Sequence, residues 1–434
     1  MLVFISDLHF VDGSAGEHNV PVDAFRIFFE DIKGNVDWLI KKGRSVEEIK
    51  IVFLGDIFDL LRTEMWFEHR GRKIPVSKRP WGSDEKAIER HANRIFDEII
   101  KKNQETFDLL SSELKDEFGL PVEPERIYVP GNHDRLCNKY QSLRKKVCRW
   151  LRIPPCDLFD HYFEDPSYGV FARHGHEYDK FNYEGGISYT HKDYMRVPIG
   201  DPITTELIAK IPWKIMKKRE IKSLPRKEQE ALKRNLQEIE NVRPFSATLD
   251  WLLYQVKKSL HLKEVIEDAV DEVIQEFNDL EFVKKWYEHH DKWTDFLDEA
   301  DKIQSVLFLL EKFKIFSLEK MMPLLERVKE VFARDDLLEA APKEYSHLDN
   351  RIRYIVYGHT HEPLQVPLRV VEGSPPKEQV YLNTGTWRKR YRKSKERLGF
   401  IGWKTLHYTV FYRKEERDTD FPAFETWTGT LKTV

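Results

Sequence analysis

Short apolar runs alternate with longer amphipathic stretches along the first 200 residues of the chain. Runs of three or four apolar residues, which are typical of buried strands, stand at Leu2 to Ile5, Ile51 to Leu54, Ile127 to Val129 and Val170 to Ala172. After the first run, apolar residues recur at the spacing of one helix face, at Phe25, Phe28, Phe29, Ile32, Val36, Leu39 and Ile40. This order predicts an α/β fold in which helices pack on the faces of a sheet.

The last part of the chain is dominated by strand patterns. Apolar runs from Ile352 to Tyr357 and from Val380 to Leu382 predict two more buried strands. Two alternating runs, Leu398 to Trp403 and His407 to Tyr412, predict a hairpin.

Between these two parts lies a long segment that contains no glycine. Of the 20 glycines, 14 precede residue 201 and six follow residue 357. Turns between strands use glycine for positive φ angles, so its absence over this length favours helices joined by short connections. We therefore predict an all-helical insertion or cap over 201–350, between a first core part at 1–200 and a second at 351–434.

Composition places the chain among globular proteins. Hydrophobic residues make up 41% and charged residues 33% of its 434 residues, which is too apolar for disorder and too charged for a membrane protein. The net charge of −3 argues against a surface built wholly to bind nucleic acid. Three cysteines without paired spacing fit a reducing compartment. We expect a cytoplasmic protein without a transmembrane segment, and the sequence leaves its oligomeric state open.

Potential metal ligands follow each of five predicted strands. The five blocks are Asp7-Leu8-His9, Gly55-Asp56-Ile57-Phe58-Asp59, Gly131-Asn132-His133-Asp134, His174-Gly175-His176 and Gly358-His359-Thr360-His361. Ligands bind at the carboxyl ends of strands in open α/β sheets, so we expect these blocks to converge. Their carboxylate, amide and imidazole groups form a mixed oxygen and nitrogen set, which suits Mn, Fe or Zn better than Mg or Ca. A single Asp-x-His is more often a turn or a helix cap, but five blocks at five strand ends favour a metal site.

This series of blocks resembles the motif set of the calcineurin-like metallophosphoesterase superfamily, over residues 1–200 and 351–434. The resemblance implies a β-sandwich flanked by helices, with αββα layers and a dinuclear metal centre at the sheet edge. It also implies a set of ligands for each of the two metal ions, with Asp56 bridging the ions. By this resemblance one ion binds Asp7, His9 and His361, and the other binds Asn132, His174 and His359.

The resemblance further implies a hydrolase that uses two divalent ions, with Mn preferred and Fe or Zn as alternatives. A hydroxide shared by the ions would attack phosphorus in line, without a phosphoenzyme. His133 would protonate the leaving oxygen, and Asp59 would orient His133. The alternatives are a helix N-cap for Asp59 and a packed core histidine for His133.

Candidate substrate-binding residues are less sharply defined. His176 follows the expected ligand His174, and it could contact substrate or lie on the rim. Two basic, aromatic-rich segments, 62–81 and 387–393, contribute Arg79, Trp81 and Arg388. Interleaved cations and aromatic rings suit a nucleotide or single-stranded nucleic acid, although a solvated loop with packed rings explains the pattern equally well.

We expect a phosphodiester, a pyrophosphate or a phosphomonoester as substrate, with a nucleotide-type phosphodiester or pyrophosphate preferred. One alternative is a metal-dependent nuclease acting on DNA or RNA, whose branch of the superfamily shares a block like residues 55–59. The other is a non-catalytic scaffold that binds a protein through the helical insertion.

Overall fold

The computed structural model describes residues 1–16, 19–186, 189–243, 260–290, 336–372, 377–396, 399–417 and 423–433, with single positions 247, 251, 254 and 255. The predicted insertion is thus described over 201–243 and 260–290 and again from residue 336. The expectation that it is helical at 291–335 lies outside the described residues.

The first sheet has the strand order β5-β2-β1-β13-β12-β8, and β14 pairs with the other edge of β13. Its strands are β1 (Leu2–Ile5), β2 (Lys50–Leu54), β5 (Glu125–Val129), β8 (Val242–Arg243), β12 (Lys389–Lys393), β13 (Phe400–Phe411) and β14 (Phe424–Thr433). Strands β1, β2 and β5 are parallel, so their carboxyl ends meet at one edge of the sheet. The long β13 runs antiparallel to β1 and to β12.

The second sheet has the order β10-β11-β9-β7-β6. Its strands are β6 (Phe163–Asp165), β7 (Val170–Ala172), β9 (Tyr354–Tyr357), β10 (Pro363–Val371) and β11 (Lys377–Thr384). Here β7, β9 and β11 are parallel. A short ribbon of β3 (Glu68–His69) and β4 (Arg72–Lys73) stands apart from both sheets.

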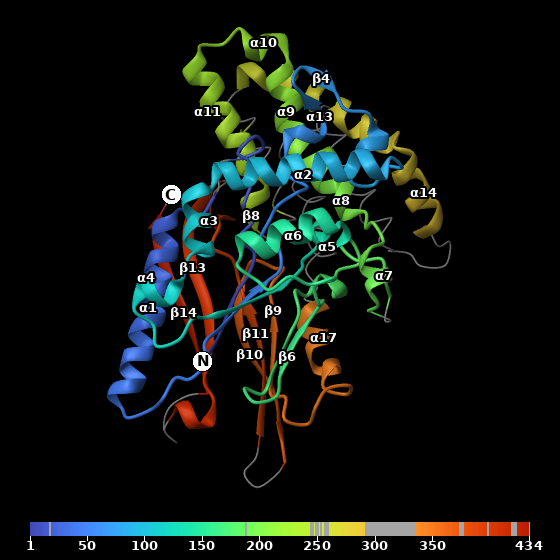
Figure 1. Cartoon of the computed structure of the whole chain (residues 1–434). Helices are drawn as coiled ribbons and strands as arrows, with labels where there is room; N and C mark the ends of the chain where they lie inside the picture. Colours follow the sequence, from blue (N-terminus) through green and yellow to red (C-terminus); the bar gives the residue numbers. More distant parts are fainter. Residues whose placement is uncertain are drawn as a thin grey trace.

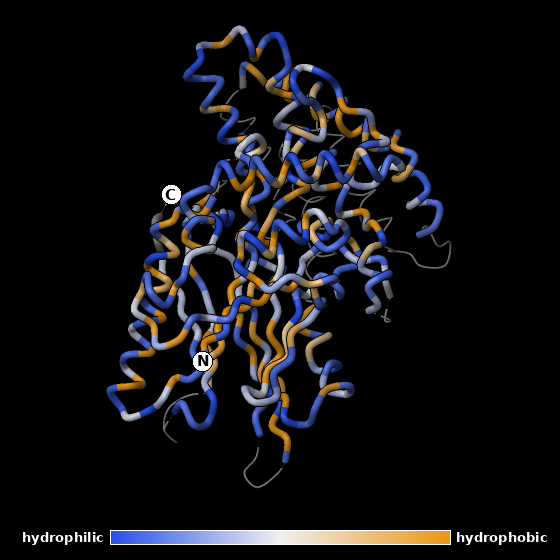
Figure 2. Tube along the Cα trace, in the orientation of Figure 1, coloured by the Kyte–Doolittle hydropathy of each residue, from blue (hydrophilic) through white to orange (hydrophobic). Residues whose placement is uncertain are grey.

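Alternation of apolar side chains along the strands gives each sheet two buried faces. One side of the first sheet packs on the second sheet through residues such as Phe4, Val52 and Val356. The other side, including Val3, Ile51 and Val410, packs against helices. Figures 1 and 2 show the apolar strands enclosed between helical layers.

The helices of the first core part are α1 (Val22–Lys41), α2 (Glu85–Lys102), α3 (Gln104–Ser111), α4 (Leu114–Phe118), α5 (Arg135–Lys139), α6 (Gln141–Trp150) and α7 (His191–Tyr194). On the outer face of the second sheet lies α17 (Asp336–Glu344), where Leu337 and Ala341 pack with Phe171 and Ile355. The mixed α/β class predicted from the sequence is confirmed.

The insertion has an apolar core of its own. Its elements are α8 (Gly200–Pro202), a π-helix (Ile203–Ala209), α9 (Lys210–Lys217), α10 (Arg219–Lys222), α11 (Arg226–Gln237), a 3-10 turn η5 (Glu238–Asn241), α13 (Lys263–Asn278) and α14 (Glu281–His290). Residues such as Ile215, Leu236 and Phe277 are buried together. Of these, α9, α10, α11 and α13 gather at one end of the molecule, beyond α2, whereas α8 and α14 do not (Figure 1).

Two expectations about the elements are wrong. The predicted hairpin at 398–412 is one strand, β13, whose pairing with β14 shifts register between Lys404 and Thr405. That irregularity breaks the alternation without turning the chain. The described part of the insertion is also not wholly helical, because β8 adds a parallel strand beside β12.

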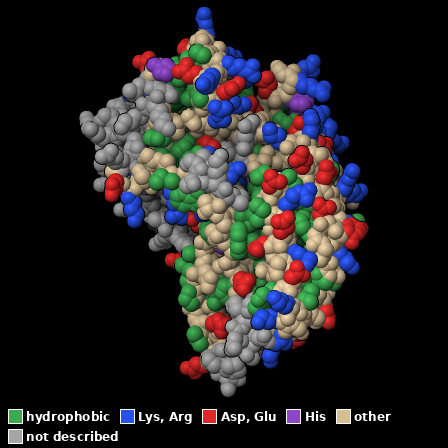
Figure 3. All heavy atoms as spheres, turned by 90° about the vertical axis from the view of Figure 1, so that its left-hand side faces the viewer, with side chains coloured by type: hydrophobic (Ala, Val, Ile, Leu, Met, Phe, Trp, Pro, Cys, Tyr) green, Lys and Arg blue, Asp and Glu red, His purple; other side chains and the backbone are tan. Residues whose placement is uncertain are grey.

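The surface carries mixed charge. On the face seen in Figure 3, basic and acidic side chains are interspersed, as the near-neutral net charge suggests. None of the helices in the described part of the chain combines the length and the apolar character needed to cross a lipid bilayer.

Candidate metal centre

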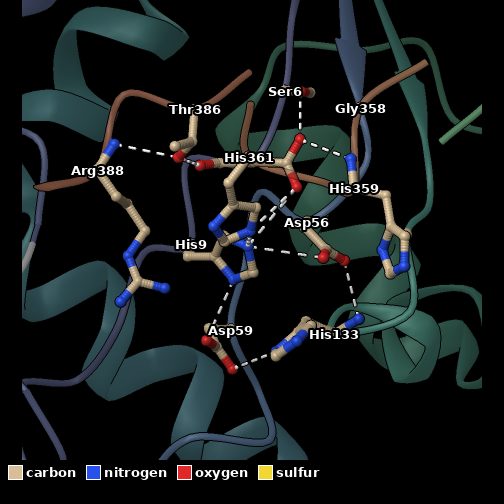
Figure 4. Close-up of polar contacts among 12 residues, drawn as sticks. Ser6, His9, Asp56, Asp59, His133, Gly358, His359, His361, Thr386 and Arg388 are labelled. Carbon is tan, nitrogen blue, oxygen red and sulfur yellow. Dashed lines mark hydrogen bonds and ion pairs between the residues drawn. The ribbon is translucent and has the colours of Figure 1, made fainter. Parts of the chain in front are cut away.

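Five strand ends bring the predicted ligands together. Asp7 and His9 follow β1, and Asp56 follows β2, while Asn132 follows β5 and His174 follows β7. Directly after β9 come His359 and His361. Parallel strands in both sheets place these ends at one edge, and Figure 4 shows most of the side chains facing a common centre.

The backbone at this edge adopts a conformation that side chains disfavour. Five of the predicted ligands have positive φ angles, namely Asp7 (51°), His9 (46°), Asp56 (53°), His359 (69°) and His361 (62°). Residues other than glycine seldom occupy this region. Strain of this kind gathers at functional sites, where it aims side chains at a ligand.

Glycines in the blocks allow the loops to approach one another. A Cβ atom at Gly55 would lie 2.3 Å from Nδ1 of His174, and one at Gly131 would lie 2.2 Å from Oδ1 of Asp56. At Gly358 the added atom would lie 2.6 Å from Oδ2 of Asp7. No side chain fits at these positions, which explains why glycine precedes three of the blocks.

Asp7, His9 and His361 form one group that could hold a metal ion. The Nε2 atoms of the two rings are 2.9 Å apart, and Nε2 of His361 is 3.4 Å from Oδ1 of Asp7. Hydrogen bonds to the other carboxylate oxygen of Asp7 come from the Ser6 hydroxyl and, at 3.0 Å, from the His359 backbone N–H. The carboxylate is therefore fixed with Oδ1 turned toward the histidines.

Asp56, His174 and His359 form a second such group. Nε2 of His174 lies 3.2 Å from Oδ2 of Asp56, and its Nδ1 lies 2.9 Å from the Leu54 carbonyl oxygen. Donation from Nδ1 to that carbonyl leaves Nε2 facing Asp56. The same Oδ2 of Asp56 is 3.6 Å from Nε2 of His9, a member of the first group. Oδ2 of Asp56 thus lies within 4 Å of a histidine nitrogen from each group.

His133 and Asp59 lie beside these groups and form, with His9, a third set of three side chains that could hold a metal ion. Nδ1 of His133 is 3.0 Å from Oδ1 of Asp59, while Nδ1 of His9 is 3.2 Å from Oδ2. The His133 backbone N–H also donates to Oδ1 of Asp56 over 2.8 Å. Asp59 is fully buried, and its Oδ1 also accepts from the Arg62 N–H over 3.0 Å, as a capping side chain does, although no helix of the described residues begins there.

Electrostatics at the centre favour a bound cation. Burial alone would raise the pKa of Asp7 and of Asp56, yet the neighbouring histidines hold both pKa values well below the usual range. In return, despite its burial, the carboxylate of Asp56 raises the pKa of His174 to about 10. Protonated histidine thus supplies positive charge to buried carboxylates, a role that a metal ion can take over.

Several buried atoms at the centre make no hydrogen bond with any described residue. They are Oδ1 of Asp7, Oδ1 of Asn132 and Nε2 of His174, of which the first and third lie at ion-pair distance from His361 (3.4 Å) and Asp56 (3.2 Å) without a hydrogen bond. Buried polar atoms are normally paired, and three such atoms in one cluster point to a missing ligand. All three belong to the predicted ligand set, so the residues present fit a metal ion.

Sequence reasoning missed the residues that hold the ligands in place. Oδ2 of Asp179 lies 2.9 Å from Nε2 of His359 and 2.7 Å from Nδ2 of Asn182. Asn182 in turn accepts from Nδ2 of Asn132 over 3.1 Å, so its amide steers Oδ1 of Asn132. Carboxylates behind metal-binding histidines are a common arrangement, but Asp179 stands in a loop with no motif that could have marked it.

The acid that ends the third block, Asp134, has a structural position. Oδ1 of Asp134 accepts from the Gly131 N–H over 2.6 Å, and Oδ2 accepts from the Ile57 N–H over 2.9 Å. These bonds tie the loop after β5 to the loop after β2. Burial, with Asp56 nearby, raises the pKa of Asp134 to about 6.

The predicted substrate residues lie in different surroundings. His176 is buried with its ring centroid 5.4 Å from that of His174, and burial lowers its pKa to about 4. Arg388 is buried near Asp59 (Figure 4). By contrast, Nε of Arg79 lies 2.6 Å from Glu206, and Trp81 packs in the core of the insertion. Arg79 and Trp81 thus fasten the insertion rather than face the metal cluster.

The chain was compared with models of protein families and with curated proteins. No family model matches this chain, and no curated protein matches it. The case for a function therefore depends on the residues and their geometry.

Proposed function

We propose that the protein is a metal-dependent phosphoesterase with a dinuclear centre, of the calcineurin-like metallophosphoesterase type. One observation carries the proposal: Oδ2 of Asp56 lies between the two ligand groups, 3.6 Å from His9 and 3.2 Å from His174. A carboxylate shared by two sets of ligands is the arrangement that a pair of metal ions requires. The two packed sheets with helices on their outer faces support the proposed family fold.

The ligand set would hold two divalent ions, with Mn preferred and Fe or Zn as alternatives. One ion would be bound by Asp7, His9 and His361. The other would be bound by Asn132, His174 and His359, and Asp56 would bind both. Such ions lower the pKa of a bound water and neutralise charge on phosphate oxygens. The chain itself fixes the positions of these groups through the bonds from Ser6, Leu54 and Asp179.

His133 is the proposed general acid for the leaving oxygen. Its imidazole contacts Asp59 at 3.0 Å, and it is the least buried member of the histidine and aspartate groups at 13% side-chain exposure. Although burial opposes ionisation, His133 and His9 keep the pKa of Asp59 well below its usual range. An ionised Asp59 holds the Nδ1 proton of His133, so the other ring nitrogen can donate to substrate.

The preferred substrate is a nucleotide-type phosphodiester or pyrophosphate, because a metal-loaded centre would bind phosphate oxygens and arginine side chains lie beside it. We also propose a cytoplasmic location, which the three free thiols of Cys137, Cys148 and Cys156 support.

The test is hydrolysis of a bis-aryl phosphate by protein loaded with Mn. The wild type is expected to hydrolyse it, and Asp56→Asn is expected to abolish both hydrolysis and metal retention, because it removes the negative charge of the shared carboxylate. Asp97→Asn is the matched control, since Asp97 is exposed and pairs only with Lys146 among the described contacts. Full activity in Asp56→Asn would contradict the proposal. No hydrolysis by a metal-loaded wild type would favour a scaffold instead.

A further inference from the structure

Arginine side chains from the insertion and from the core meet beside the first ligand group. The insertion reaches this place through η5 and β8, which end its first described stretch. The core contributes Arg62, which contacts Glu240 of the insertion and lies 3.7 Å from Oδ2 of Asp59. It also contributes Arg388, which stands just before β12. The proposed mechanism uses none of these guanidinium groups.

Arg243 is brought to the metal ligands by strand pairing. Parallel pairing of β8 with β12 sets Arg243 opposite Arg392. Two backbone carbonyls, those of Glu240 and Val242, accept from Nη1 of Arg243 at 2.6 and 2.9 Å. Nη2 then lies 2.5 Å from Nδ1 of His361. A residue of the insertion thus directly contacts a predicted metal ligand.

Arg388 is almost fully buried, at 1% exposure. Its Nη2 donates to Asn241 over 2.6 Å and lies 3.4 Å from Oε2 of Glu240. Among the described residues, its Nε and Nη1 have no hydrogen-bond partner. Burial lowers the pKa of Arg388 to about 10 even though Asp59 and Glu238 act in the opposite direction. The neighbouring acids therefore do not fully compensate this buried cation.

Glu240 is the acid closest to these cations, and two arginines share it. Its Oε2 contacts both Arg62 and Arg388. Guanidinium groups bind phosphate and carboxylate through two parallel N–H donors. Nε and Nη1 of Arg388, which make no hydrogen bond among the described residues, are donors that a further anion would satisfy, and Nη2 of Arg243, already bonded to His361, carries a second N–H that could join them.

We propose that Arg243 and Arg388 form a guanidinium clamp that binds a second, non-scissile phosphate of the substrate. This inference rests on the proposed function, and it selects pyrophosphate-type substrates over simple diesters. A diester carries one negative charge, which the metal ions and their ligands would already neutralise. Nε and Nη1 of Arg388 would then stay buried and without a hydrogen bond, whereas an adjacent phosphate would pair them.

Binding of two non-hydrolysable probes tests the clamp without depending on turnover. Methylenediphosphonate and methylphosphonate are titrated into Mn-loaded protein by calorimetry, and metal content is measured afterwards to detect chelation. The wild type is expected to bind the diphosphonate at least about tenfold more tightly. In Arg243→Gln and Arg388→Lys, the ratio of the two affinities should fall toward one. Arg392→Gln is the control, since Arg392 lies on β12 but is exposed and pairs with Glu362.

An unchanged affinity ratio in Arg243→Gln would overturn the proposal. Arg243 is partly exposed, and its side chain bonds to the carbonyls of Glu240 and Val242 and to the ring of His361. We therefore expect Arg243→Gln to fold. This variant keeps the test valid if Arg388→Lys fails to fold. If the wild type retains no metal, the proposed function fails. The same titrations on the metal-free protein then judge the clamp separately, by whether Arg243→Gln still lowers the ratio.

Discussion

The metal cluster and the interior of the insertion differ in the kind of side chain that they bury. The core of the insertion is apolar, as at Ile215 and Phe277, and charges on its outer side pair with one another, as when Lys214 contacts Glu272 and Glu276. At the strand ends, charged groups are buried on backbone with positive φ angles, and several polar atoms lack hydrogen bonds among the described residues.

This difference separates stability from function. An apolar core needs no ligand, because its side chains satisfy one another. A buried group of carboxylates and imidazoles is costly unless something neutralises it. Substitutions in the insertion should therefore change unfolding, whereas substitutions at the strand ends should change metal binding and catalysis.

The largest effect is expected from His133→Ala. Loss of a general acid lowers kcat by about 10²–10⁴-fold, while metal content should stay as in the wild type because His133 belongs to the acid pair. Steady-state hydrolysis of a bis-aryl phosphate and metal analysis measure the two quantities. His347→Ala is the control, since His347 is exposed in the turn that follows α17. Wild-type turnover in His133→Ala would remove its proposed role.

Phe277→Ala should show the reverse behaviour. Phe277 is completely buried in the core of the insertion, and truncation of a buried phenylalanine costs about 3–5 kcal/mol of folding free energy. Denaturant unfolding measures this loss, and metal content per folded chain should not change. A loss of bound metal without a loss of folding free energy in Phe277→Ala would contradict the separation of stability from metal binding.

Two glycine substitutions compare the regions at the level of the backbone. Gly131→Ala would place a Cβ atom 2.2 Å from Oδ1 of Asp56, so we expect about 1–3 kcal/mol of destabilisation together with weaker metal binding. Gly34→Ala, in α1, meets nothing within 4 Å and should stabilise the protein by about 0.5–1 kcal/mol. Thermal unfolding of both variants, with and without Mn, gives the result. Equal effects in the two variants would contradict the close packing of the loops.

At neutral pH, the smallest effect on unfolding free energy is expected from His161, a histidine outside the ligand set. Burial lowers the pKa of His161 to about 3, and its ring stacks on Tyr194 at 3.6 Å between centroids. As the pH falls below about 6.5, His161 therefore binds a proton in the unfolded chain but stays neutral in the folded chain. Stability from this group is present above pH 6.5 and falls by about 1 kcal/mol per pH unit between pH 6 and 4. In His161→Gln this part of the slope should disappear from unfolding curves; an unchanged slope would reject the assignment.

The strands and the convergence of the candidate ligands were predictable because both depend on local signals. Apolar runs marked β1, β2, β5, β7 and β9 to within two residues, and chemistry-bearing residues followed each run. The convergence of these blocks follows from parallel strands, whose carboxyl ends share an edge.

Other features depend on contacts between distant segments. The bond from Asp179 to His359 joins residues 180 positions apart, and the contact of Arg243 with His361 requires β8 to pair with β12. Arg79 and Trp81 looked like substrate contacts because their segment is basic and aromatic. Their partners, Glu206 and the core of the insertion, lie far along the chain and leave no local pattern.

The central claim is that two ligand groups share Asp56, and the number of metal ions bound at saturation tests it most directly. Metal-free protein is titrated with Mn by calorimetry, and the bound metal is then measured after desalting. The account predicts close to two ions per chain in the wild type. Saturation at one ion or none would contradict it.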